Sequence, residues 1–240
     1  MAEAAVRLAE NVWRIPTAPF SGTNSFAFLD GDGQVTLVDC GMSFAPPRIV
    51  AGLAAFGKHP RDVTRIVLTH AHADHAGGAA KIRARTGAPV AVHADDAGFA
   101  RRGEIPPPDT SRTAGRLFAR FGVKRFPPLE VGQELRDGDE LDVGGGLRVV
   151  HTPGHTPGHV SLLHPGSGVL VTGDCIQRAR HPVVAEVPVH GPASDPGHRR
   201  PTGRPGVRRR RLHARAAHRR ACPRARARLP HVGPPDMSRI

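Results

Sequence analysis

Four side chains that can bind a metal ion lie within six residues of this 240-residue chain. They belong to the segment His70-Ala-His72-Ala-Asp74-His75, which directly follows the largely apolar run at residues 65–69. In an extended segment, side chains two residues apart point to the same side, so His70 and His72 can bind one ion together. Asp74 and His75 then turn elsewhere. This arrangement suits two adjacent cations, or one cation with a carboxylate held over its bound water.

A second histidine cluster lies further along the chain, between two strand-like runs at residues 147–150 and 160–163. Its sequence is His151-Thr-Pro-Gly-His155-Thr-Pro-Gly-His159. The proline and glycine residues predict a tight turn that presents a ring nitrogen at the edge of a sheet.

A carboxylate follows a third apolar run. Residues 168–172 read as a buried strand, and Gly173-Asp174 ends it. A carboxylate at a strand end, beside histidines, can bridge two metal ions. The residue types alone therefore indicate a metal centre built from three separated stretches of the chain.

These three elements together resemble the metallo-beta-lactamase superfamily, with its HxHxDH motif, its ligand histidine in a TPGHTPGH-type turn and its bridging aspartate in a TGD strand end. The resemblance runs from about Asn11 to Asp174. It implies six metal ligands: His70, His72 and His155 for the first ion, Asp74 and His75 for the second, and Asp174 linking both.

The resemblance gives other histidines lesser roles. His151 and His159 are expected to support the ligands, and His93 to be a packing or loop residue. The family also implies one more ligand histidine, some forty to fifty residues beyond Asp174. Its identity stays open, because each candidate has an unsuitable distance or surroundings: His198, His213, His218 and His231.

The C-terminal fifty residues differ sharply in composition from the rest. Residues 191–240 hold fourteen arginines against two acids, so they carry twelve of the thirteen net positive charges. With few large apolar side chains, this segment cannot offset its ordering entropy. We expect a metallo-beta-lactamase-like domain at residues 1–190 and a disordered Arg/Pro-rich tail at residues 191–240.

Two explanations compete for this tail. A basic tail can bind nucleic acid or anionic lipid through counterion release. No aromatic residue, however, lies among the arginines to stack on bases. The Arg/Pro/Ala/Gly/His composition instead suggests translation of GC-rich coding sequence out of frame. We hypothesise a frameshift between about Arg178 and His198 that replaced the family's last strands, helix and ligand.

The remaining composition bounds the class of protein. No apolar run approaches the roughly twenty residues of a membrane span. The first ten residues contain acids where a signal peptide is apolar, and the three cysteines show no paired spacing. We therefore expect a cytoplasmic protein with a small-molecule substrate, no specific nucleic-acid partner and no membrane contact. The oligomeric state stays open.

The elements predicted around these motifs are short strands and helices. The α+β class follows from them, whereas the four-layer αβ/βα sandwich, here without its last strands and helix, is implied by the resemblance. A Pro-rich insertion at residues 103–130 lies between the ligand motifs, either as a cover over the site or as a surface excursion. Strands are predicted at residues 11–15, 24–29, 34–39, 65–69, 89–92, 140–143, 147–150, 160–163 and 169–172, and helices at 46–57, 78–86, 95–101 and 112–121.

The ligand types predict zinc, in a binuclear site with a single ion or iron as alternatives. Zinc brings the pKa of its bound water to about 7, and the resulting hydroxide attacks a carbonyl. Asp74 would orient this nucleophile and carry protons. We therefore expect a zinc-dependent hydrolase of an ester-like bond in a small molecule, for which thioesters and lactones are typical of the family. The chain has no tyrosine, which weakens both the lactonase and the glyoxalase II assignments.

Two alternatives remain. His70, His155 and Asp174 could form the two-histidine, one-carboxylate face of a mononuclear iron oxygenase, as in the persulfide dioxygenases of the superfamily. The chain could also be a catalytically impaired product that lacks the final metal ligand.

Overall fold

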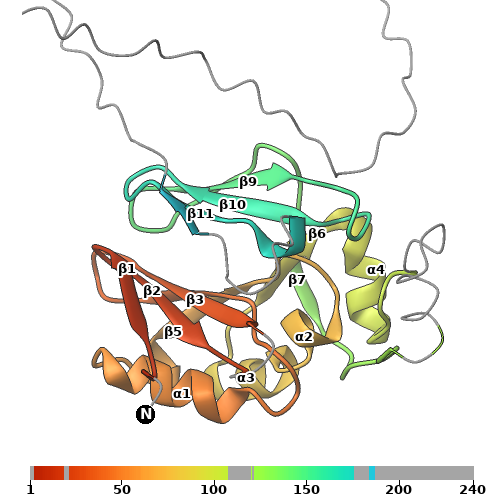
Figure 1. The fold of residues 1–240 in the computed structure, drawn as a ribbon, viewed down its shortest axis with the longest axis horizontal. Helices are drawn as coiled ribbons and strands as arrows, with labels where there is room; N and C mark the ends of the chain where they lie inside the picture. Colours follow the sequence, from red (N-terminus) through yellow and green to blue (C-terminus); the bar gives the residue numbers. More distant parts are fainter. Residues whose placement is uncertain (1–2, 19–21, 108–119, 121, 176–183, 187–240) are drawn as a thin grey trace, which may run out of the picture.

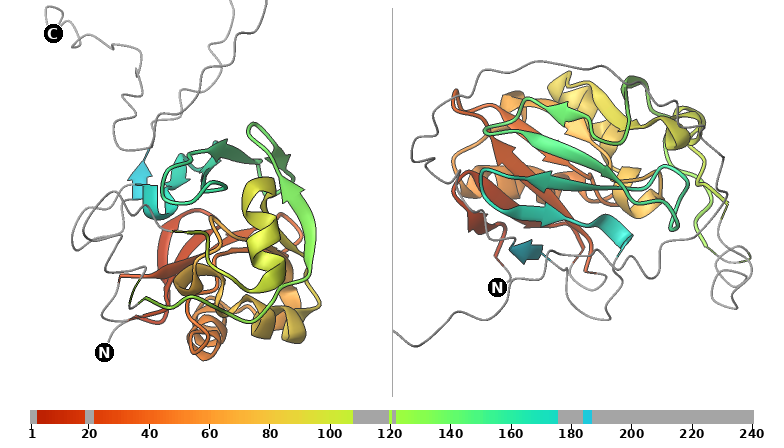
Figure 2. Two further views of the ribbon diagram at one scale, coloured as in Figure 1. Left: turned by 90° about the vertical axis from the view of Figure 1, so that its right-hand side faces the viewer. Right: turned by 90° about the horizontal axis from the view of Figure 1, so that it is seen from above.

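The computed structural model describes residues 3–18, 22–107, 120, 122–175 and 184–186. They form two β-sheets packed face to face, with helices on the outer side of the first sheet (Figure 1, Figure 2). The predicted α+β class and the metallo-beta-lactamase-type sandwich are confirmed. Within the described ranges, every helix is too short or too polar to span a membrane.

The first sheet has seven strands, and their order in space follows their order in the chain. The first four pair antiparallel, and each later strand pairs parallel to its predecessor. Four consecutive buried residues make up the fourth strand, as expected where both faces are covered. The strands are β1 (Val6–Ala9), β2 (Val12–Pro16), β3 (Asn24–Leu29), β4 (Val35–Val38), β5 (Val63–Val67), β6 (Val90–His93) and β7 (Val131–Leu135).

Helices connect the parallel strands, because such a pair needs a crossover rather than a tight turn. Prolines 46 and 47 open the first of these helices, and Gly87 ends the second in a left-handed conformation. Ile49 and Ile82 are buried in the core that lies beneath the helices. The crossover helices are α1 (Pro46–Ala55), α3 (Ala79–Thr86) and α4 (Ala94–Arg102).

The second sheet is antiparallel and covers the other face of the first. Phe28 and Val67 from the first sheet share one buried cluster with Leu147 and Leu162 from the second. The space between the sheets is therefore the second of two hydrophobic cores. In spatial order the strands are β12 (Val184–Glu186), β11 (Val169–Val171), β10 (Val160–His164), β9 (Leu147–His151) and β8 (Glu140–Leu141).

Two strands of the first sheet were not predicted from the sequence. β1 and β7 contain intermediate and exposed residues, so neither shows a buried apolar pattern. Pairing with a neighbour makes each of them a strand. Asn11, predicted to begin a strand, instead has a positive φ of 61° in the turn between β1 and β2.

Several expectations concern residues that the structure does not describe. The predicted helix at residues 112–121 lies outside the described ranges, apart from Arg120. So does the Arg/Pro-rich segment 191–240, and of the proposed frameshift site at about residues 178–198 the structure describes only residues 184–186. Among the described residues, the sandwich has three layers, and α1, α3 and α4 pack against the first sheet. The fourth layer and the 1–190 boundary stay predictions.

Phe28 tests the importance of the core between the sheets, because its side chain is almost fully buried there. Phe28→Ala is expected to lower the free energy of unfolding by about 3–5 kcal/mol. Phe44→Ala is the matched control: Phe44 is 60% exposed, so the expected loss is within about 0.5 kcal/mol. Denaturant unfolding measures both, and equal losses would contradict this packing.

Candidate metal centre

The histidine motif lies where parallel strands of the first sheet end. Carboxyl ends of parallel strands meet at one edge of a sheet, where open α/β sheets commonly form their sites. Asp39 follows β4, His70 follows β5, and Asp96 lies in α4 directly after β6. Loops of the second sheet bring His155 and Asp174 to the same place.

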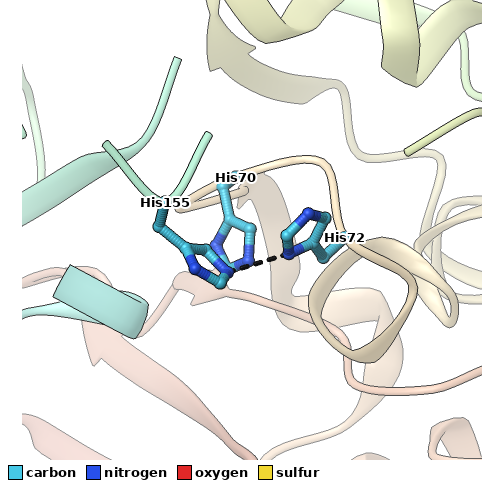
Figure 3. A group of neighbouring side chains, drawn as sticks. All are labelled: His70, His72 and His155. Atoms are coloured by element: carbon cyan, nitrogen blue, oxygen red, sulfur yellow. Dashed lines mark hydrogen bonds between the residues drawn. The ribbon is translucent and has the colours of Figure 1, made fainter. Parts of the chain in front are cut away.

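The first candidate group consists of His70, His72 and His155, whose ligand atoms all lie within 4.8 Å of one another (Figure 3). His72 Nδ1 and His155 Nε2 are 2.8 Å apart. His70 is fully buried, and its Nε2 has no hydrogen-bond partner among the described residues. A buried ring nitrogen without a partner is costly unless something binds it, so the group fits a metal ion.

The second candidate group shares His70 and adds His75 and Asp174. One Asp174 oxygen lies 3.3 Å from His75 Nε2, and the other lies 3.4 Å from His155 Nε2. The carboxylate therefore faces both groups at once. This is the arrangement that a carboxylate bridging two ions requires.

Asp74 lies at the rim of the site. It is the second residue of the short helix α2 (Ala73–Ala76), which turns the chain immediately after the extended His72. Its side chain is 45% exposed, and Oδ2 is 3.7 Å from His75 Nε2. Asp74 belongs to neither of the two groups. Its predicted role as a ligand and proton carrier stays a prediction.

Asp39 holds the second metal group in place, although the sequence analysis did not select it. Its carboxylate accepts hydrogen bonds from the backbone N–H and the hydroxyl of Thr69, both at 2.8 Å. It also lies 2.8 Å from His75 Nδ1. Because Nδ1 is held, Nε2 of His75 faces Asp174. The available signal in the sequence was an acid directly after the apolar run at residues 35–38. The structure adds that Asp39 has a positive φ of 57°.

His159 holds the loop of Asp174, in agreement with its expected supporting role. Its Nε2 accepts a hydrogen bond of 3.0 Å from the backbone N–H of Asp174. Nδ1 therefore carries the proton and donates it to the Thr152 hydroxyl, 2.8 Å away. A Cβ at Gly173 would lie 2.6 Å from Nε2, so only glycine allows this approach.

A third group of potential ligands, His93, Asp95 and His151, lies apart from the first two. The rings of His93 and His151 stack at 4.1 Å with only 9° between their planes. Lone pairs in parallel planes do not converge on one ion. His151 Nε2 lies 2.9 Å from the carbonyl of Pro157, and His93 Nδ1 accepts from the Asp95 N–H. The stack therefore supports the TPGH turn, as expected of packing residues.

Burial sets the charge of the metal-free centre. It lowers the pKa of His70 and of His155, and it lowers the pKa of His72 to about 4. Asp174 differs: burial disfavours its charge, but His75 keeps the pKa of its carboxyl below the usual value. His70, His72 and His155 are thus neutral and Asp174 is ionised at neutral pH, which are the forms that bind zinc. His75 is the exception in the metal-free centre, because Asp39 and Asp174 outweigh its burial and raise its pKa.

Comparison with known proteins agrees with this geometry. The metallo-beta-lactamase superfamily matches residues 18–217 of the chain. The chain belongs to the metallo-beta-lactamase superfamily. The match extends past Asp174 into residues that the structure does not describe. Family membership, fold and His-rich candidate metal groups therefore agree with one another.

The similar proteins include hydrolases and beta-lactamases. Hydroxyacylglutathione hydrolase of Cereibacter sphaeroides is 32% identical over 158 residues, which cover 64% of this chain and 49% of that protein. The solved Rm3 metallo-beta-lactamase is 30% identical with a TM-score of 0.57, covering 72% of this chain and 58% of its own. A metallo-beta-lactamase of Cronobacter sakazakii is 28% identical with a TM-score of 0.56, covering 71% and 60%. The chain spans about half the length of the first of these.

All four candidates for the further ligand histidine that the family implies lie outside the described residues. Of the six ligands that the sequence predicted, the structure brings together His70, His72, His75, His155 and Asp174. Asp74 lies at the rim of this group.

The buried imidazoles predict that acid destabilises the metal-free protein. The pKa of His159 is lowered to about 3, by burial and then by His155 and His75, and that of His72 to about 4. Between these values and pH 6.5, the unfolded chain binds protons that the folded chain does not, so stability falls as the pH falls. The pKa of His75 is raised, because Asp39 and Asp174 outweigh its burial, so its contribution is constant in this window.

We expect the melting temperature in a chelator to be lower at pH 5 than at pH 7, by roughly 4 °C or more. Thermal unfolding followed by circular dichroism measures it. An unchanged or higher value at pH 5 would contradict the assignment of neutral, buried imidazoles.

Proposed function

We propose that this protein is a zinc-dependent hydrolase of an ester-like bond in a small molecule. The observation that carries the proposal is the position of Asp174, with one oxygen toward His75 and the other toward His155. Two sets of histidine ligands with a carboxylate between them form a donor set suited to two zinc ions.

The residues of the centre would bind two ions. His70, His72 and His155 would hold the first ion, and His75 the second, with Asp174 between them. When bound, zinc lowers the pKa of a water to about 7 and stabilises negative charge on a carbonyl oxygen.

Proton transfer falls to Asp74 in this proposal. Its carboxylate is the most exposed acid of the centre, and it lies beside His75 at the rim. There Oδ2 can accept a proton from the nucleophile and release it to the leaving group or to solvent.

The ester-like substrate class is supported by the relatives. Several are hydroxyacylglutathione hydrolases, including those of Cereibacter sphaeroides and Fuscovulum blasticum. An acyl group on a thiol is therefore the first substrate class to assay, followed by lactones. With no tyrosine in the chain, a phenolic hydroxyl cannot polarise the carbonyl, so that task falls to the metal.

Removing a ligand should abolish metal uptake and turnover together. For His70→Ala and for Asp174→Ala we expect at least about a 100-fold loss of thioester hydrolysis. His70 belongs to both candidate groups, and Asp174 is the carboxylate that lies between them. Zinc content and hydrolysis of a hydroxyacyl thioester of glutathione are measured on the same samples. His59→Ala, which removes an exposed histidine, is the control and should keep both. Undiminished turnover by zinc-free Asp174→Ala would end the proposal.

Metal analysis of protein purified without added metal separates hydrolysis from oxygenation. About two zinc ions per chain are expected for the hydrolase. One iron per chain, with oxygen consumption in the presence of a persulfide, would overturn it in favour of the oxygenase. A chain that binds neither metal would indicate the impaired product.

A further inference from the structure

The side chain of Asp96 is a fully buried carboxylate. Its hydrogen bonds come from residues next to the candidate metal ligands and not from the side chains of the ligands. Asp96 lies in the first turn of α4, and its side chain is 0% exposed. A buried carboxylate is costly unless every oxygen accepts hydrogen bonds. The partners of Asp96 are therefore informative.

These partners belong to the two loops that carry the first metal group. Oδ2 accepts from the backbone N–H of Ala71 at 2.9 Å and from the Thr156 hydroxyl at 2.8 Å. Oδ1 accepts from the backbone N–H of Gly158 at 2.7 Å. Ala71 stands between His70 and His72, and Thr156 follows His155. One carboxylate thus joins two loops more than eighty residues apart in the chain.

The second loop is shaped to reach this carboxylate. A Cβ placed on Gly158 would lie 2.6 Å from the Asp96 backbone nitrogen and 2.8 Å from its Cβ and Cγ. Gly158 has no positive φ, so the glycine serves close approach and not an unusual backbone conformation. The second half of the TPGHTPGH repeat is therefore packed directly on Asp96.

We propose that Asp96 is a positioning residue that sets the separation between the His70–His72 loop and the His155 turn, and so determines the zinc affinity of that group. It acts through backbone and hydroxyl groups beside the ligands. The inference rests on the zinc site of the proposed function.

A simpler role for Asp96 would be to stabilise the start of α4, since acids are favourable in the first turn of a helix. Asp95 provides the comparison, because it lies in the same turn with a side chain that is 58% exposed. Its carboxylate is 3.8 Å from His93 Nδ1 and reaches neither ligand loop in the described contacts. Asp95→Asn therefore removes a charge from the same turn and leaves the link between the loops intact.

The test compares Asp96→Asn with Asp95→Asn in the full chain. An amide can accept on one side only, and its NH2 would face the N–H donor of one loop. We expect Asp96→Asn to weaken zinc binding about 10–100-fold, as loss of a group that orients metal ligands does, and Asp95→Asn to change it less than about threefold. Zinc affinity is measured by competition with a chromogenic chelator, and the melting temperature is measured without zinc.

A purely structural role would give a different result. Asp96→Asn would then lower the melting temperature of the zinc-free protein while the folded fraction bound zinc as tightly as wild type, and the inference would be overturned. Equal losses of affinity in both variants would overturn it too. Wild-type protein that bound no zinc would instead sink the proposed function itself.

A second pair of variants keeps the test decisive if Asp96→Asn does not fold. Thr156→Val removes one of the three hydrogen bonds in nearly the same volume, whereas Thr156→Ser keeps the hydroxyl. We expect the zinc affinity of Thr156→Val to fall about 5–10-fold below that of Thr156→Ser, as expected for a buried hydrogen bond to a charged group. Equal affinities in this pair would contradict the role of Asp96.

Discussion

The centre depends on the cost of burying imidazole rings. A buried ring can offer one nitrogen to a metal only if the other is held by a partner or is otherwise satisfied. Asp39 does this for His75, and Thr69 Oγ1 lies 3.0 Å from His70 Nδ1. The metal centre therefore depends on the residues that hold the ligand rings as well as on the ligands themselves.

The same requirement couples the two sheets. The ligands come from loops of both sheets, so their distances depend on how the edges meet. The backbone N–H of Val160 in β10 donates to the carbonyl of Thr69 after β5. Asp96 joins the His70–His72 loop to the His155 turn, and His159 holds the backbone of Asp174. A hydrophobic core between the sheets sets the coarse distance, and these hydrogen bonds set the fine one.

Strands with a clear apolar pattern could be predicted from the sequence. β3 was predicted with its observed bounds, and α3 within one residue, because burial and Gly87 mark them. β1 and β7 could not be predicted, since both contain exposed side chains and depend on a neighbouring strand. Asp39 was overlooked for a related reason: its role depends on contact with His75, which is thirty-six residues away in the chain.

The sequence by itself determined the chemistry: closely spaced imidazoles and carboxylates at strand ends, and the order of motifs that marks the superfamily. Spacing of two residues is local geometry, so it can be interpreted without a fold. The tertiary structure decided which of these groups share a neighbourhood, placing Asp174 between two imidazole groups and leaving Asp74 at the rim. It also revealed Asp39 and Asp96, because a buried carboxylate is explained by donors that only folding brings to it.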